Sequence, residues 1–449
     1  MTDTSSAALV RQRMRDAPSV SLVTATAIAV ADIIGIGVFT SLGFQIKDIP
    51  SPFSLLALWV VGGIVALCGA LSYSELAAAF PRSGGEYNYL SRIFHPAAGF
   101  LAGWVSATVG FAAPIALAAM AFGDYFRGVV PGAPPLLLGL LTIWIVSLVH
   151  LSGVQRGSKL QNISTLLKVA LILCLIIAGL CLSERQPISF APSLRDFDHM
   201  SGGPFAVSLV FVLYSYSGWN APTYIASEVR DPQRTLLRSI IGALLVVMAL
   251  YIFLNAVFLI TTPMAEMAGN VDVGLIAGRY IFGEFGGRIV GALICLGLVS
   301  AISSMIWVGP RVSMVMGEDL PVLRFLSRKT RNGVPASALL FQVAVATLLL
   351  ITNSFEGVLN FIQFSLTFCS FLTVLGVIML RYTQPALPRP YRTWAYPLPP
   401  LIFLSFALFV MYYLLMERPV QSLAGLATML AGLLIYAASQ AASRRWSNG

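Results

Sequence analysis

The stretch Asp32-Ile33-Ile34-Gly35-Ile36-Gly37-Val38-Phe39 lies in the middle of the first long apolar segment of the chain. A helix of about 20 residues in hydrocarbon must satisfy every backbone polar group internally, so a Gly-x-Gly sequence at that depth is costly unless the opened backbone is used. In transporters such a break exposes N–H groups to anionic substrate groups and carbonyl groups to cations. The alternative is that these glycines mark close helix packing. We interpret the stretch as half of a substrate site.

The composition places the chain in a bilayer. Of its 449 residues 57% are hydrophobic and only 10% are charged, whereas soluble domains carry about 25% charged residues. The first apolar segment is too long for a cleavable signal peptide. The five cysteines fall within apolar stretches and the three histidines form no cluster, so we expect no metal, cofactor or disulfide framework. The net charge of +9 is expected to reflect membrane topology rather than a nucleic-acid partner.

Twelve apolar segments are long enough to span a membrane, at approximately 19–44, 53–80, 97–122, 135–153, 160–182, 204–226, 237–262, 289–316, 336–353, 357–380, 395–416 and 420–440. Most of the 28 basic residues then fall on one side, together with the two tails, 1–18 and 441–449. Because basic residues concentrate in cytosolic loops, both termini are predicted to be cytosolic, in a multi-pass protein of the cell (plasma or inner) membrane. The basic residues on this side include Arg11, Arg13, Arg15, Arg82, Arg92, Arg156, Lys159, Arg230, Arg234 and Arg238.

A second interruption is predicted at Tyr214-Ser215-Tyr216-Ser217-Gly218, where small polar residues and a glycine replace aliphatic ones in the sixth segment. Five segments separate the two interruptions. This spacing is expected if 19–182 and 204–380 are inverted repeats of five spans each, with 395–440 added as two further spans. Broken helices at corresponding positions of two halves indicate a transporter site. The alternative is that the two interruptions are unrelated local irregularities in their helices.

Several ordered motifs give the chain a family resemblance. From about residue 20 to 345 it resembles the amino acid–polyamine–organocation (APC) superfamily, and within it bacterial relatives of the L-type and cationic amino acid transporter-like permeases. The resemblance implies an all-α, LeuT-like inverted-repeat fold, alternating access and an amino acid substrate. The matching motifs are Gly35-Ile36-Gly37-Val38-Phe39, Ser72-Tyr73-Ser74-Glu75-Leu76, Pro81-Arg82-Ser83-Gly84-Gly85-Glu86-Tyr87-Asn88-Tyr89, Gly99-Phe100-Leu101-Ala102-Gly103-Trp104, Tyr216-Ser217-Gly218-Trp219-Asn220 and Gly309-Pro310-Arg311.

The resemblance also implies where a zwitterion would bind. The substrate carboxylate would lie at the backbone of Ile36 and Gly37, beside Gly35, and Tyr214 would be an aromatic gate. Relatives usually carry Ser, Ala or Thr where this chain has Ile36, which removes a possible hydroxyl donor. The substrate ammonium would lie near the carbonyls of Ile33, Tyr214 and Ser217, with Gly218 in the second opened backbone.

Lys168 stands at the head of a long apolar run in the fifth segment. An intramembrane lysine costs about 2.5–3.5 kcal/mol on insertion scales, which makes it a functional candidate. The alternative is that its side chain snorkels to the interface. Sodium-independent members of the superfamily have a lysine here in place of a sodium ion. By that resemblance its partners would be the carbonyl of Gly35 and a hydroxyl among Ser300, Ser303 and Ser304.

Asp32 lies one helical turn before Gly35. Aspartates in membrane helices are rare and are usually paired or titratable. Asp32 is therefore a candidate for holding a substrate ammonium or carrying a proton, and the alternative is a structural, hydrogen-bonded carboxyl. The superfamily resemblance offers no role for it.

Four classes of membrane protein are candidates for this sequence: a channel, an enzyme, a nutrient sensor and a transporter. A channel would need a filter or charged ring, and a membrane enzyme would need a polar cluster at depth, and neither is visible in the sequence. A transport-dead nutrient sensor would share the whole pattern. We predict a sodium-independent secondary amino acid transporter, with proton-coupled uptake favoured over exchange because Asp32 adds a titratable group. The loop at 123–134 has no cysteine, so no disulfide-linked heavy chain is expected.

Overall fold

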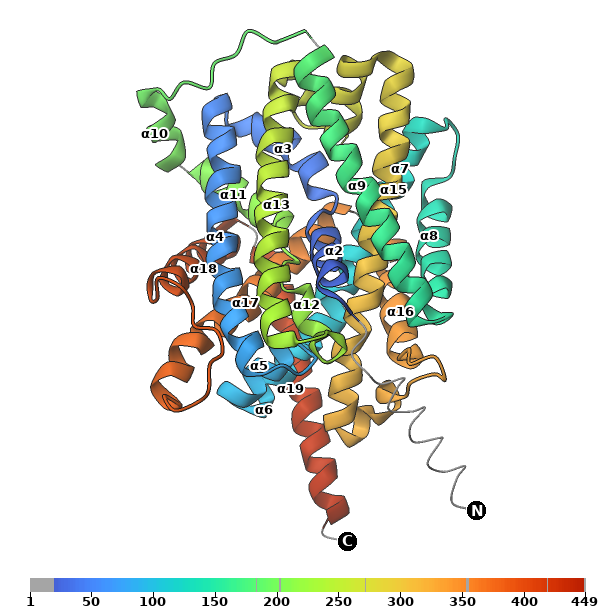
Figure 1. Ribbon diagram of the computed structural model, residues 1–449, viewed down its shortest axis with the longest axis vertical. Coiled ribbons are helices and arrows are strands. Elements are labelled where there is room, and N and C mark those ends of the chain that lie inside the picture. The colour runs from blue at the N-terminus through green and yellow to red at the C-terminus, as the bar shows by residue number, and fades with distance from the viewer. Residues whose placement is uncertain are drawn as a thin grey trace.

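The computed structural model describes residues 20–182, 184–201, 203–270, 272–352, 355–417 and 419–447. Within these ranges the chain is helical, and its only extended pairing is an isolated parallel bridge between Val20 and Val229. The helices run mostly along one axis, and the chain folds them into a single bundle (Figure 1). The predicted tail at 1–18 lies outside the described residues.

The first half of the chain contains two short, consecutive helices followed by longer ones. They are α2 (Leu22–Ile33), α3 (Gly37–Asp48), α4 (Pro52–Ala79), α5 (Glu86–Ile93), α6 (Pro96–Val105), η1 (Ser106–Gly110), α7 (Ala112–Val129), α8 (Pro135–Leu151) and α9 (Val154–Leu182). The second half contains α10 (Leu194–Ser201), α11 (Gly203–Ser215), α12 (Ala221–Tyr224), η2 (Ala226–Glu228), α13 (Pro232–Thr261), α14 (Met264–Met267), α15 (Val273–Asp319), η3 (Pro321–Ser327), α16 (Ala336–Thr352), α17 (Phe355–Thr383), α18 (Leu398–Glu417) and α19 (Pro419–Ser447).

Nine helices among the described residues are long and apolar enough to cross a membrane. Three of the twelve predicted segments instead contain shorter apolar helices, α8, α11 and α16. The chain is therefore an all-helical protein with many candidate membrane spans. The count of twelve spans and the inverted repeat stay predictions.

Several helix ends differ from the predicted segments. α15 begins at Val273 and runs through a kink at Gly283, where φ is +74°, whereas the predicted segment began at 289. α19 continues to Ser447, beyond the predicted end at 440. Apolarity marks only the part of a helix that needs hydrocarbon, and helices continue into polar turns as long as the backbone bonds persist.

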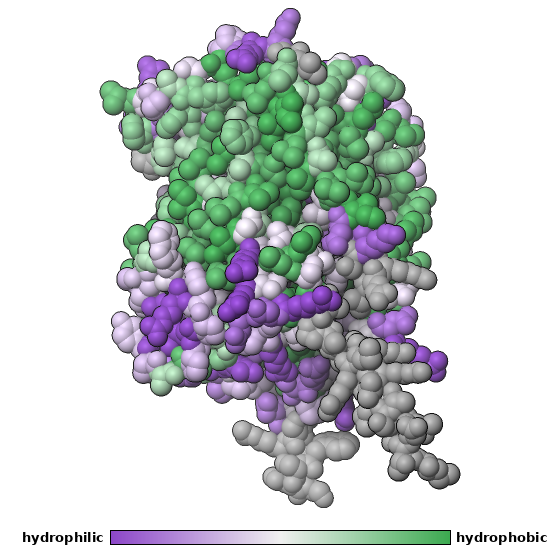
Figure 2. Space-filling view, viewed as in Figure 1, coloured by the Kyte–Doolittle hydropathy of each residue, from purple (hydrophilic) through white to green (hydrophobic). Residues whose placement is uncertain are grey.

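The surface agrees with a membrane environment. Figure 2 shows hydrophobic residues over most of the visible face, with hydrophilic residues gathered at the end of the molecule where α19 ends. Large apolar side chains point outward from many helices, including Val23, Leu148, Leu166, Phe285 and Leu434. Such broad apolar exposure is costly in water and favourable in lipid.

Two discontinuous helices occupy the middle of the bundle. The pair α2 and α3 and the pair α11 and α12 pack among α4, α9, α13 and α15, with α13 lying against both α4 and α2 (Figure 1). The main buried apolar cluster includes residues from both pairs, such as Ile28, Ile33 and Tyr216. The long helices therefore form a scaffold that holds the two interruptions at its centre.

Candidate functional site

The first interruption lies between α2, which ends at Ile33, and α3, which begins at Gly37. The Gly35 N–H donates to the Ile33 carbonyl at 2.8 Å. Among the described residues, no acceptor takes the N–H of Ile36 or Gly37. These two groups start α3 and carry the positive end of its dipole, so they can bind an anionic group.

The second interruption follows α11, which ends at Ser215, and precedes α12, which begins at Ala221. Gly218 adopts φ +94°, a conformation that favours glycine. Ser217 donates to the Tyr214 carbonyl from both its N–H, at 2.9 Å, and its hydroxyl, at 2.7 Å. Both interruptions predicted from the sequence are thus present as non-helical backbone.

The two interruptions touch one another at their glycines. A Cβ on Gly218 would lie 2.9 Å from the carbonyl carbon and oxygen of Asp32. A Cβ on Gly37 would lie 2.3 Å from the hydroxyl oxygen of Ser215, which is itself 3.1 Å from the Ser41 hydroxyl. Only residues without a side chain allow the two broken helices to approach this closely.

Tyr251 on α13 connects the same two interruptions. Its hydroxyl lies 2.9 Å from the Ile33 carbonyl oxygen and 3.1 Å from the Ser215 carbonyl oxygen, and the side chain is fully buried. These carbonyls belong to the last helical residues before each break, where helix carbonyls lose their usual partners. The Ile33 carbonyl also accepts the Gly35 N–H, whereas no N–H of the turn after α11 donates to the Ser215 carbonyl among the described residues. Tyr251 therefore satisfies backbone groups that the breaks leave open.

Lys168 reaches the first interruption from α9. Its side chain is only 2% exposed, and its Nζ donates to the carbonyls of Ile34 at 2.5 Å and Ala31 at 3.2 Å. The snorkelling alternative is therefore wrong. The predicted contact with the Gly35 carbonyl is also wrong, because the turn after α2 presents the carbonyls of Ala31 and Ile34 to α9 instead.

The predicted serine partners of Lys168 bind other groups. Ser300 lies 3.3 Å from the Thr165 hydroxyl, Ser303 lies 2.9 Å from His150 Nε2, and Ser304 donates to the Ile28 carbonyl at 3.2 Å. Among the described residues, none of the three hydroxyls bonds to the ammonium. The two backbone carbonyls released by the end of α2 meet that need.

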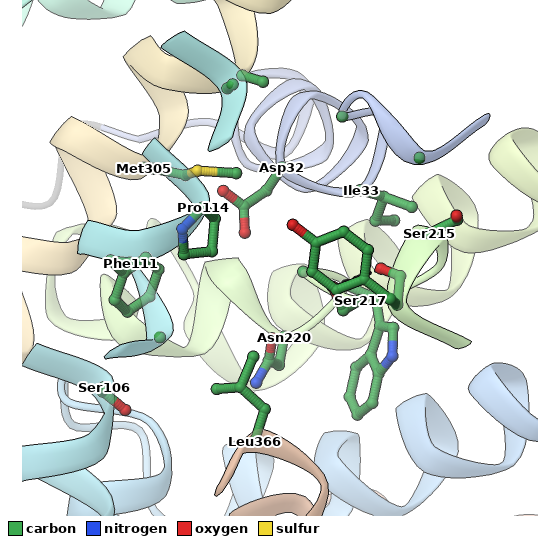
Figure 3. Close-up of a pocket in the computed structure, with 18 of the residues that line it drawn as sticks. Asp32, Ile33, Ser106, Phe111, Pro114, Ser215, Ser217, Asn220, Met305 and Leu366 are labelled. Atoms are coloured by element: carbon green, nitrogen blue, oxygen red, sulfur yellow. Dashed lines mark hydrogen bonds between the residues drawn. The ribbon is translucent and has the colours of Figure 1, made fainter. Parts of the chain in front are cut away.

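A cavity of about 110 Å³ lies between the two interruptions. One water molecule needs about 10–15 Å³ by the same measure, so the cavity holds several waters or a small solute. Asp32 and Leu366 lie on opposite sides of it (Figure 3). Its lining includes Asp32 and every predicted substrate-binding residue, namely Ile33, Gly35, Ile36, Gly37, Tyr214, Ser217 and Gly218.

Comparison with known proteins identifies the family. A family model described as "Amino acid permease" matches residues 20–439, nearly the whole chain. The chain belongs to the amino acid permease family. This membership makes it a membrane transporter of amino acids and not an enzyme.

Individual relatives have low sequence identity to this chain, but each match extends over most of both chains. The permease is 29% identical to the large neutral amino acids transporter small subunit 2 of Mus musculus, over 93% of this chain and 80% of the relative. It is 28% identical to the b(0,+)-type amino acid transporter 1 of Homo sapiens, over 92% and 86%. It is 25% identical to the serine/threonine exchanger SteT of Bacillus subtilis (strain 168), over 93% and 95%.

Asp32 lies against Gly218, where the two helix breaks of the permease meet. Its carboxyl group faces the cavity, the residue is 9% exposed, and Oδ1 has no hydrogen-bond partner among the described residues (Figure 3). No basic side chain of that part of the chain lies within ion-pair distance of it. Buried carboxyl groups in membrane helices are usually paired or titratable, and among the described residues this one has no ion-pair partner.

Sequence reasoning missed the cavity wall that η1 and α7 supply. It is formed partly by Phe111 and Pro114, after a π-helical turn at Ser106–Gly110. Pro114 has no N–H to donate toward the Gly110 carbonyl, and π-turns inside helices are frequent at functional sites. The signal was the sequence Gly110-Phe111-Ala112-Ala113-Pro114 within a predicted span.

Acidic residues near the end of the bundle where α2 begins divide into two kinds. Glu75 is paired with Arg381 at 2.7 Å and Glu228 with Arg311 at 2.8 Å. Glu86 instead accepts hydrogen bonds from the hydroxyl groups of Tyr73 and Ser370. This difference in partners separates Glu86 from the other two.

Removing the Tyr251 hydroxyl tests whether its hydrogen bonds hold the two helix breaks in position. We expect Tyr251→Phe to lower amino acid transport by about tenfold, because a buried carbonyl at the breaks loses its donor at a cost of about 1–3 kcal/mol. Uptake into proteoliposomes measures this. Tyr280→Phe is the matched control, since its hydroxyl binds Glu266 at an exposed site. Unchanged transport by Tyr251→Phe would show that the hydroxyl does not position the breaks.

Proposed function

We propose that the permease is a sodium-independent secondary amino acid transporter that works by alternating access. The observation that carries this is the buried Lys168 ammonium, bound to two carbonyls at the first helix break. A fixed ammonium there supplies the positive charge that a bound sodium ion would otherwise provide. The pairing of two broken helices around one cavity supports a 5+5 inverted repeat in which α18 and α19 are the added spans.

We propose that the substrate carboxylate binds at the open N–H groups of Ile36 and Gly37. The substrate ammonium would lie on the carbonyl side of the breaks. There the Ile33 carbonyl accepts the Tyr251 hydroxyl and the Gly35 N–H, and the Tyr214 carbonyl accepts two donors from Ser217. The substrate ammonium would share these acceptors with the donors already present. Backbone groups therefore hold both ends of the zwitterion, and Tyr214 borders the cavity as the proposed gate.

Proton-coupled uptake is the coupling mode that we favour. Asp32 lines the cavity, and one of its carboxyl oxygens has no hydrogen-bond partner among the described residues, so it offers a titratable group beside the substrate. Amino acid exchange is the second candidate, and the name of the relative SteT, a serine/threonine exchanger, favours it. Names of the relatives also direct the choice of substrates toward neutral amino acids.

The proposed orientation puts both termini in the cytosol and the chain in the cell membrane. The gathering of hydrophilic residues at the end of the bundle where α19 ends supports it (Figure 2). The permease is proposed to work without a disulfide-linked heavy chain, since 123–134 contains no cysteine.

The test is counterflow and uptake in proteoliposomes, with leucine, serine, threonine and lysine as substrates. Proton coupling predicts uptake that rises with an inside-alkaline pH gradient and collapses with a protonophore, at equal rates with and without sodium. Exchange predicts uptake that requires internal amino acid and ignores the gradient. Sodium-dependent uptake, or no flux of any amino acid, would contradict the proposal.

Asp32→Asn is expected to flatten the pH dependence of uptake, since the amide cannot exchange a proton. It fills nearly the same volume, so the packing against Gly218 is kept. The measurement is the ratio of initial rates with and without the pH gradient. Asp124→Asn is the control, because Asp124 pairs with Arg127 at an exposed site. A ratio equal to that of the unmodified permease would indicate that Asp32 has only a structural role.

A further inference from the structure

Glu86 is a buried carboxyl that the proposed site does not use. It is the first residue of α5 and is only 3% exposed, yet it lines the same cavity as Asp32. Its partner Ser370 also lines the cavity and lies one helical turn beyond Leu366 on α17. α5 lies toward the end of the bundle where α19 ends (Figure 1).

The hydrogen bonds of Glu86 leave one carboxyl oxygen open. Tyr73 donates its hydroxyl to Oε1, and the Ser370 hydroxyl lies 3.2 Å from the same atom. No bond reaches Oε2 from the described residues, and no arginine or lysine among them forms an ion pair with this carboxyl. Glu75, by contrast, has Arg381 and Arg389 within ion-pair distance.

The groups that face Glu86 are neutral at neutral pH. They are Tyr73 from α4, Tyr89 from α5 itself, Tyr224 from α12 and Cys369 from α17, and Asp32 lines the same cavity. An ionised carboxylate without a cation is costly in such surroundings. Burial accordingly raises the pKa of Glu86 to about 7, so the side chain exchanges a proton in the physiological range.

We propose that Glu86 is a second proton-binding carboxyl of the permease, which releases the coupled proton at the cytosolic end of the cavity. When the cavity opens to the cytosol, water hydrates the Oε2 side, the O–H bond of Glu86 breaks, and the proton passes to that water. When the cavity next opens to the opposite side, the carboxylate takes up a proton from a hydronium ion of the water that enters there, which leaves a neutral water molecule. This inference rests on the proton coupling proposed above.

The first experiment compares uptake with and without an inside-alkaline gradient in proteoliposomes. We expect Glu86→Gln to bring the ratio of the two initial rates close to 1, because the amide accepts from Tyr73 and Ser370 but cannot exchange a proton. Glu284→Gln, at an exposed pair with Arg279, should keep the ratio of the unmodified permease. A gradient effect in Glu86→Gln as large as in the unmodified permease overturns the inference alone. No gradient effect in the unmodified permease overturns the proposed coupling and this inference together.

A second variant tests the inference even if Glu86→Gln fails to fold. Tyr73→Phe removes the hydroxyl that stabilises the ionised form, so the midpoint of the pH profile of uptake should shift to higher pH by several tenths of a unit. An unshifted midpoint contradicts the inference. A structural role for Tyr73 would lower the rate at every pH without moving that midpoint.

Thermal unfolding of the purified permease supplies a readout independent of transport. Because the pKa of Glu86 is higher in the folded protein than the ordinary value of 4.5, folding takes up a proton between about pH 4.5 and 7. That contribution to stability is complete at the acidic end of the window and is lost as the pH rises through it. The melting temperature should therefore fall less steeply with rising pH in Glu86→Gln than in the unmodified permease, and equal slopes would contradict the inference.

Discussion

Lys168→Ala is expected to lower amino acid transport by about 100-fold or more. The ammonium is the donor to the carbonyls of Ala31 and Ile34, and both lie at the end of α2 where no helical N–H can replace it. Each buried carbonyl left without a donor costs about 1–3 kcal/mol, and each 1.36 kcal/mol corresponds to tenfold. The turn between α2 and α3 would relax into another conformation and lose the open N–H groups of Ile36 and Gly37.

Initial rates of counterflow in proteoliposomes measure this effect, with gel filtration and thermal unfolding to establish that the variants fold. Lys168→Met separates charge from volume, because methionine fills most of the lysine stem beside Gly297 but donates no hydrogen bond. Both variants should be inactive. Lys159→Ala is the matched control, since Lys159 is exposed on the same helix. Transport by Lys168→Met at the rate of the unmodified permease would refute the role of the ammonium.

The positions of the two helix breaks were predictable because their causes are local. Gly35 and Gly37 in the first segment, and Ser217 and Gly218 in the sixth, interrupt apolar runs that otherwise favour unbroken helix. The depth of Lys168 was predictable for a similar reason, since its neighbours in the chain are apolar. Residue type and spacing alone carry this information.

The partners of Lys168 were not predictable, because they depend on how the chain turns after α2. The sequence cannot specify which carbonyls that turn presents to α9. The same limit applies to the cavity wall. Phe111 and Leu366 reach the cavity only because α7 and α17 pack beside the breaks, and packing between distant helices leaves no mark in local sequence. Glu86 shows the same limit, since its side chain reaches the cavity only through the packing of α5 against α17.

Gly218→Ala is expected to abolish transport, with a loss of at least about 100-fold. At φ +94° an alanine is strained by about 1–2 kcal/mol. Its Cβ would also lie 2.9 Å from the carbonyl carbon and oxygen of Asp32, which are backbone atoms that no rotamer change can move away. The second broken helix must therefore shift from the first. Since the substrate binds between them, a displacement of a few tenths of an ångström acts directly on both halves of the site.

The same argument fixes the control and the expected stability. Gly242→Ala on α13 has open space at its Cβ and no positive φ, so it should transport normally and be slightly more stable. Gly218→Ala should lower stability by only about 1–3 kcal/mol, because overpacking at one contact leaves the surrounding scaffold of long helices in place. Folded but inactive protein is thus the expected outcome, read from thermal unfolding and counterflow. Normal transport by Gly218→Ala would mean that the permease tolerates a wider separation of its two broken helices, and that their close contact does not shape the substrate site.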